Sequence, residues 1–209
     1  MKDYSGYHQT NSNIKIEKNG LEILEHSLRG FEGYDVIIND TRQTKVLMYQ
    51  KYDAENTCKK IIGKVEDIEL GNLLFFNNLN WLVTTFPEDN KIYRKAEIKL
   101  CNATFPIKSS KTKILKGYNK YGKPLYDDIY DVNKFSPCIV ESKNTNPNND
   151  NQLSISENQL LITLQYQESD TLVLNYEFEM YGERYKIINI DYTKVISDIG
   201  ILKLIAERV

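Results

Sequence analysis

The sequence predicts an all-β protein, with two small β-barrel or sandwich domains in tandem after an N-terminal arm and one short helix. Residue usage is the first indication, because the 209 residues include 15 tyrosines but few alanines. Tyrosine and isoleucine favour strands, whereas alanine favours helices. Short runs of alternating apolar and polar residues are the second indication. A pattern that occurs twice along the chain is the third.

Residues 1–33 are predicted to form the arm and the helix. Residues 1–19 have no sustained hydrophobic period and many small polar residues, which is typical of an arm. In residues 21–30, LEILEHSLRG, the apolar side chains are spaced as on one face of a helix, and Gly30 marks its end.

Residues 34–108 are predicted to form the first β-domain. Strands are expected in YDVIIND, TKVLMYQ and KKIIGKVED. The clearest hairpin is LLFFNNLNWLVTTF, whose Asn77 and Asn78 suit the positive φ angles of a tight turn. After the polar tetrad PEDN, IYRKAEIKLC resumes as a strand. The residues expected in the core are Trp81, Val83, Phe86, Ile98 and Leu100.

Residues 109–209 are predicted to form the second β-domain. The basic stretch KSSKTK (108–113) marks the boundary, and a hairpin is expected with its turn near residues 119–122. Further strands are expected in SPCIVES, LLITLQYQ, TLVLNYEFEM, RYKIINI and ILKLIAERV. Residues 143–152 are polar and rich in asparagine, which predicts a solvated loop.

The pattern of residues 80–101 returns in residues 184–205 at a constant offset of 104. Gly182 stands where Asn78 stood, so the turn chemistry repeats as well. Upstream the two copies diverge, and residues 143–152 are interpreted as an insertion. A true duplication is the favoured interpretation, and chance similarity of two amphipathic hairpins is the alternative. The matched pairs are Trp81 with Tyr185, Val83 with Ile187, Phe86 with Ile190, Ile92 with Ile196, Ile98 with Leu202, and Leu100 with Leu204.

No catalytic residue, metal site or cofactor is expected from the motifs. His8 and His26 have no metal-ligand spacing, and the chain has no phosphate-binding glycine loop and no nucleophile signature. The acidic window around Asp127, Asp128 and Asp131 is expected to be solvated. The three dispersed cysteines are expected to be buried free thiols: Cys58, Cys101 and Cys138.

The net charge of −2 indicates no general attraction to nucleic acid or anionic membranes. No apolar run approaches the roughly 18 residues of a spanning helix, and no secretory signal is expected at the N-terminus. Two alternatives stay open. A small barrel could bind single-stranded nucleic acid through the lysines of residues 108–123 and the interleaved Tyr118 and Tyr121, or the chain could be a hydrolase without a recognisable signature.

Four stretches carry a resemblance to a known family: YSGYHQTN, LEHSLRG, the hairpin with Trp81, and IYRKAEIKLCNATF (92–105). They resemble neck proteins of tailed bacteriophages from Gram-positive hosts, the small β-barrel proteins called head-closure, stopper or head–tail joining proteins. The resemblance covers residues 4–105. Many stoppers are single barrels, so the second β-domain also leaves open another neck or tail-completion role.

The resemblance implies a non-enzymatic virion protein made in the host bacterial cytoplasm. It would form a homo-oligomeric ring in the neck, between the portal or adaptor and the tail tube or tail terminator. The ring would close the DNA channel and offer a docking face to the tail, with no sequence-specific DNA binding and no membrane. Interface or gating roles are expected in the arm and in two polar loops, at Tyr4, Tyr7, Glu88, Asp89, Asn90, Asn146 and Asn149.

Overall fold

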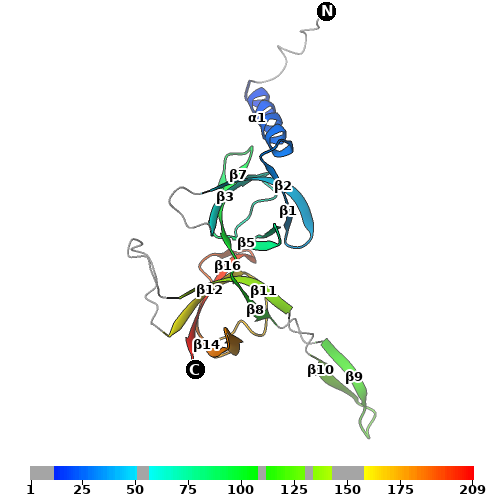
Figure 1. Ribbon diagram of the computed structural model, residues 1–209. Coiled ribbons are helices and arrows are strands. Elements are labelled where there is room, and N and C mark those ends of the chain that lie inside the picture. Colours follow the sequence, from blue (N-terminus) through cyan, green and yellow to red (C-terminus); the bar gives the residue numbers. More distant parts are fainter. Residues whose placement is uncertain (1–11, 51–56, 108–111, 130–133, 143–157) are drawn as a thin grey trace, which may run out of the picture. The chain divides into compact units, whose positions relative to one another are not determined.

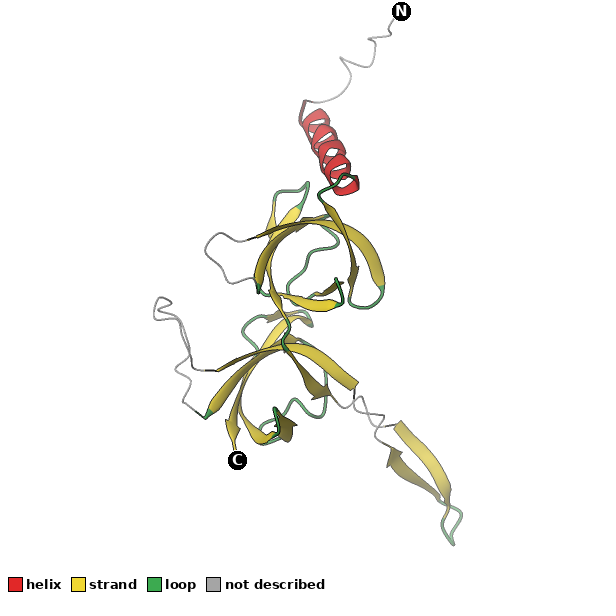
Figure 2. Ribbon diagram, in the orientation of Figure 1, coloured by secondary structure: helices red, strands yellow, loops and turns green. Residues whose placement is uncertain are grey.

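A computed structural model describes residues 12–50, 57–107, 112–129, 134–142 and 158–209 (Figure 1). This part of the chain has one helix, and strands dominate the rest (Figure 2). The all-β class with two barrel-like units is therefore confirmed. The chain divides into two compact units, Met1–Leu100 and Cys101–Val209. This division precedes the basic stretch expected at the boundary, because residues 103–107 pair with a strand of the second unit.

Helix α1 (Ser12–Arg29) is longer than the helix expected over residues 21–30, so residues 12–19 of the expected arm are helical. Leu24 and Leu28 are buried and pack with Leu47, which anchors the C-terminal half of the helix on its own barrel. Gly20 lies inside the helix, where glycine is rarely favoured. The side chain of Ile92 lies so close to it that a Cβ at this position would press against Ile92.

The first barrel closes on itself. Its strands pair in the circle β1, β2, β3, β7, β5, β4 and back to β1, and closure leaves few unpaired edges. The turns at Asn39–Asp40 and Asn77–Asn78 have positive φ at both residues, as tight hairpins require. The bounds are β1 (Gly33–Ile38), β2 (Arg42–Gln50), β3 (Cys58–Gly63), β4 (Leu73–Phe76), β5 (Leu79–Val83), the short β6 (Glu88–Asp89) and β7 (Arg94–Leu100).

The core of the first barrel contains Trp81, Val83 and Ile98, all buried, with the half-buried Leu100 packed against them. Phe86 is a correction: it was expected in the core, but 51% of its surface is exposed. Strand β5 ends at Val83, so the inward and outward alternation of a strand no longer applies at Phe86.

The second barrel has the same strand order but is open. Its path runs β13, β14, β16, β12, β11, β8, which corresponds to β4, β5, β7, β3, β2, β1 of the first barrel. No ladder joins β8 to β13 among the described residues, although the rings of Phe105 and Phe178 meet edge to face at 4.9 Å. The bounds are β8 (Ala103–Ile107), β11 (Lys134–Ser142), β12 (Gln159–Gln165), β13 (Glu177–Met180), β14 (Glu183–Asp191), β15 (Val195–Ile196) and β16 (Ile199–Arg208).

Strands β9 (Thr112–Tyr118) and β10 (Pro124–Ile129) form a hairpin in a sheet of their own, with its turn where the sequence predicts it. The hairpin is inserted between β8 and β11, where the first barrel has only the Asn39–Asp40 turn between β1 and β2. One expected strand is shorter than predicted, because only Glu177–Met180 of TLVLNYEFEM is extended.

The repeat extends further upstream in the backbone than in the sequence. At the same offset of 104, β13 has the bounds of β4, and β14 begins where β5 begins but continues to Asp191. In the first barrel Val83 exchanges backbone hydrogen bonds of 3.0 Å with Gly71 and Asn72. In the second, Ile187 does the same with Asn175 and Tyr176, at 2.8 and 3.0 Å. The two units therefore share one architecture through the segment before the hairpin.

Candidate functional site

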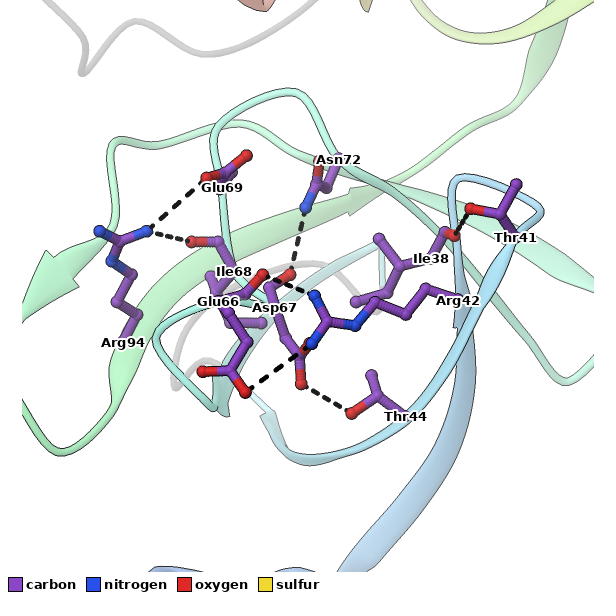
Figure 3. Close-up of polar contacts among 10 residues, drawn as sticks. All are labelled: Ile38, Thr41, Arg42, Thr44, Glu66, Asp67, Ile68, Glu69, Asn72 and Arg94. Atoms are coloured by element: carbon purple, nitrogen blue, oxygen red, sulfur yellow. Dashed lines mark hydrogen bonds and ion pairs between the residues drawn. The ribbon is translucent and has the colours of Figure 1, made fainter. Parts of the chain in front are cut away.

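The segment between β3 and β4, residues 64–72, is held by a polar cluster (Figure 3). Asp67 is 1% exposed, and its carboxylate accepts a 2.7 Å hydrogen bond from Thr44 and lies 2.9 Å from the Arg42 guanidinium. The backbone carbonyl of Asp67 accepts a hydrogen bond from the side chain of Asn72. A buried carboxylate is tolerated because a cation and hydrogen-bond donors surround it.

Two arginines satisfy the other acceptors of this segment. Arg42 also donates to the Glu66 carbonyl at 3.1 Å and lies 3.7 Å from its carboxylate. Arg94 donates to the Ile68 carbonyl at 3.4 Å and lies 4.0 Å from the Glu69 carboxylate (Figure 3). Since each carboxylate faces a cation from the same barrel, the cluster fixes the segment and the buried Ile68 in place, and we interpret it as structural.

The matching segment of the second barrel, residues 166–176, is built differently. Thr171 stands where Asp67 stood; it is also fully buried, and its hydroxyl pairs with Ser169 at 2.9 Å. A shallow depression of about 390 Å³ opens beside it, lined by Tyr166, Glu168, Asp170 and Tyr192, among others. Within the part of the chain that the structure describes, Glu168 and Asp170 have no ion-pair partner. We call this site the acidic depression.

The tyrosine of the acidic depression is affected by its surroundings. Partial burial raises the pKa of Tyr166, and the nearby carboxylates of Asp198 and Glu168 raise it further. The lysines of this region, Lys194 and Lys203, act instead on Asp191, whose pKa is lowered first by the backbone N–H of Thr193. The depression is thus a negatively charged, partly aromatic surface.

The thiols of the second barrel are not activated. Burial raises the pKa of Cys101 and of Cys138 to about 12, so both stay protonated at neutral pH. A protonated thiol is a poor nucleophile and a poor metal ligand. Among the described residues, no group of three or more histidine, cysteine, aspartate or glutamate side chains is placed to hold a metal ion. Among the described residues, no helix combines the length and the apolar character that crossing a membrane requires.

The loop predicted to gate, Glu88–Asn90, is exposed but tied to its neighbours. Glu88 pairs with Lys95 at 2.7 Å, and Asp89 pairs with Arg94 at 2.9 Å. The Asn90 side chain accepts hydrogen bonds from the next turn. The backbone N–H of Lys91, followed by Arg94, lowers the pKa of Asp89. The loop is an ordered surface feature, and its gating role stays a prediction.

Four predicted residues, Tyr4, Tyr7, Asn146 and Asn149, lie outside the described residues. The structure therefore brings together only Glu88, Asp89 and Asn90 of the expected interface set.

Exposed apolar side chains occur on many parts of the surface, including two elements outside the barrels. On α1, Ile14, Ile16 and Ile23 are 55 to 68% exposed. On hairpin β9–β10, Leu115 and Leu125 are about half exposed, and Tyr121 at the tip is 89% exposed. Exposed apolar groups of this kind mark contact surfaces. The sequence could have indicated those on α1 through Ile14 and Ile16, which fit no inward face, but it assigned this stretch to the arm.

Comparison with known proteins places these features in a family. The YomX N-terminal domain matches residues 6–100, and the YomX C-terminal domain matches residues 90–207. An SPbeta prophage-derived uncharacterized protein, YomX of Bacillus subtilis (strain 168), is 34% identical over 210 aligned positions, covering 100% of this chain and 97% of that protein. No solved structure matches the chain significantly.

Proposed function

Because this chain belongs to the YomX family, with a prophage-derived relative along its whole length, we propose that it is a non-enzymatic structural protein of a phage particle. In this proposal it forms a homo-oligomeric ring in the neck, between the portal or adaptor and the tail. The ring closes the DNA channel after packaging and gives the tail a docking face.

The observation that carries the proposal is the placement of exposed apolar residues on elements that contribute no strand to either barrel. Helix α1 and hairpin β9–β10 add nothing to the closed circle of β1–β5 and β7 or to the path from β8 to β13. A two-stranded hairpin is marginally stable alone in water. Elements of this kind are typical of subunits whose partners cover them in an assembly.

Electrostatics support a channel role. The net charge of −2 provides no surplus of lysine and arginine to neutralise phosphates, which is the main source of nonspecific DNA affinity. DNA could therefore pass a ring of this protein without being retained.

The experiment is to delete the gene from an inducible prophage that encodes it and to examine the lysate by electron microscopy. We expect DNA-filled heads separate from complete tails, and rescue by the gene supplied in trans. Immunogold labelling of purified wild-type virions should place the protein at the neck. Intact infectious virions from the deletion strain, or absence of the protein from purified virions, would overturn the proposal.

The same preparation tests the alternatives. A single-strand-binding barrel would show salt-dependent binding of the purified protein to oligonucleotides. A tail-completion protein would be labelled on isolated tails instead of at the head vertex.

A further inference from the structure

The tip of hairpin β9–β10 is a preorganised basic surface. The Asn119 side-chain oxygen accepts hydrogen bonds of 2.9 Å from the backbone N–H groups of Tyr121 and Lys123, and Gly122 has a φ of +72°. The turn therefore holds its shape without a partner. Lys120 and Lys123 are exposed in the same turn as Tyr121, so the tip carries two ammonium groups and one exposed aromatic ring.

Among the described residues, no cation forms an ion pair with Glu168 or Asp170 of the acidic depression, in contrast to the matching segment of the first barrel. In the first barrel, Arg42 is the first residue of β2 after the Asn39–Asp40 turn, and it neutralises Asp67 and Glu66. In the second barrel, the connection from β8 to β11 contains the hairpin instead of that turn. Strand β11 begins with a lysine, Lys134, at the register position that Arg42 has in β2, but among the described residues Lys134 forms no ion pair with Glu168 or Asp170. The connection before this strand differs, since its hairpin carries a lysine-bearing tip.

We propose that the tip of this hairpin docks in the acidic depression of a second copy of this chain. Lys120 and Lys123 face Glu168 and Asp170 there, and Tyr121 packs with Tyr166 and Tyr192. Lysine ammonium groups suit a site made of carboxylates and aromatic faces. The apolar base of the depression, at Leu172 and Leu202, suits an aromatic ring. The contact is head to tail, which is the kind of interface that builds a ring when its rotation closes.

This inference rests on the proposed ring and names the contact that builds it. The first test measures the mass of the purified full-length chain by sedimentation and native mass spectrometry. We expect wild type to be oligomeric and the double variant K120E/K123E to be monomeric at the same concentration. The control K60E/K91E makes the same change of net charge at exposed lysines of the first barrel and should remain oligomeric.

A charge exchange sharpens the test. The variant E168K/D170K should also be monomeric, and a chain that carries both this pair and K120E/K123E should recover at least half of the oligomer. If K120E/K123E stays oligomeric, the docking inference is overturned while the ring stands. If wild type is monomeric alone and also with portal and tail proteins, the ring itself fails.

A second measurement separates contact between copies from contact within one chain. Unlabelled and ¹⁵N-labelled chains are mixed, allowed to exchange, and treated with a carbodiimide, which joins lysines to carboxylates in direct contact. Cross-linked peptides of Lys120 or Lys123 with Glu168 or Asp170 should contain one labelled and one unlabelled partner in about half of the pairs. Only pure-isotope pairs, or no such peptides, would overturn the proposal.

Discussion

The two barrels share a strand order and a repeated hairpin, but they differ in how they are completed. The first closes through β1 and β4, has a tight turn between β1 and β2, and neutralises its connecting segment with Arg42 and Arg94. The second carries a hairpin in place of that turn. Among the described residues, its seam between β8 and β13 has no ladder, and Glu168 and Asp170 have no ion-pair partner. The first barrel is thus self-sufficient, whereas the second has groups that a partner could complete.

Strand registers differ too. Val83 pairs with Ile98 in the first barrel, but its counterpart Ile187 pairs with Ala206, four residues beyond the counterpart of Ile98. The inward positions still match, because a shift by an even number of residues keeps each side chain on its face. Two barrels with the same apolar pattern can therefore keep the same inward positions while their strand pairings differ in register.

Truncating matched core side chains of the two barrels should have the largest effect on stability. Ile98 and Leu202 are both fully buried, and truncation of either to alanine should destabilise its own barrel by about 2–5 kcal/mol. The chain's single tryptophan, Trp81, lies in the first core, so its fluorescence reports that barrel alone in urea unfolding. I98A should lower the urea midpoint measured by tryptophan fluorescence. L202A should leave that midpoint unchanged and lower only a midpoint measured by circular dichroism. Equal shifts of both signals would mean that the barrels unfold as one unit.

The next largest effect is expected from exchanging glycine and alanine at the matched positions 200 and 96, which should change the stability of the two barrels by different amounts. Gly200 has a φ of +144°, and a Cβ there would overlap the Lys194 carbonyl oxygen, whereas the matching residue of the first barrel is Ala96. We expect G200A to destabilise the second barrel by about 1–3 kcal/mol. The reciprocal A96G should cost the first barrel about 0.5–1 kcal/mol. Urea midpoints by circular dichroism and fluorescence check both, and a harmless G200A would contradict the assigned backbone geometry.

Substitutions of the two matched buried polar residues, Asp67 and Thr171, should differ less in their effect on the free energy of unfolding. D67N removes the charge opposite Arg42 and should cost about 1–2 kcal/mol, since Arg42 is half exposed and water replaces part of the interaction. T171V removes only the contact with Ser169 and should cost about 1 kcal/mol or less. The control D35N breaks an exposed pair with Lys45 and should leave the fluorescence midpoint nearly unchanged. Equal effects of D67N and D35N would refute the structural role of the cluster.

The smallest expected effect is on acid stability. The pKa values of Asp89 and Asp191 are lowered in the folded state, chiefly by backbone N–H groups. Folding favours each carboxylate, so its contribution is present above the unfolded pKa of about 3.9 and is lost as pH falls through the folded value. The urea midpoint of the first barrel, followed by Trp81 fluorescence, should therefore decrease less steeply below about pH 4 in D89N than in wild type. An unchanged pH profile would show that the hydrogen bonds of Asp89 do not contribute to stability.

Local chemistry made much of this fold predictable. The turn residues Asn77–Asn78 and Gly182 fixed two hairpins, and alternation put Val83 and Ile98 inside. These features depend on neighbouring residues along the chain, so their signal survives in the sequence. Two predictions were wrong. Phe86 was expected in the core but is exposed, because β5 ends before it. The helix was expected to begin near residue 21 but begins at Ser12.

By itself, the sequence determined the all-β class, the two tandem β-units and the repeat, because strand alternation and turn geometry are local properties. Only the tertiary structure decided that the repeat extends upstream, since the bonds of Val83 and Ile187 are made by backbone groups that side-chain patterns do not reveal. It also decided that Arg42 neutralises Asp67, while Glu168 and Asp170 have no such partner among the residues that the structure describes. Those differences arise from pairings between segments far apart in the chain, and residue spacing does not encode them.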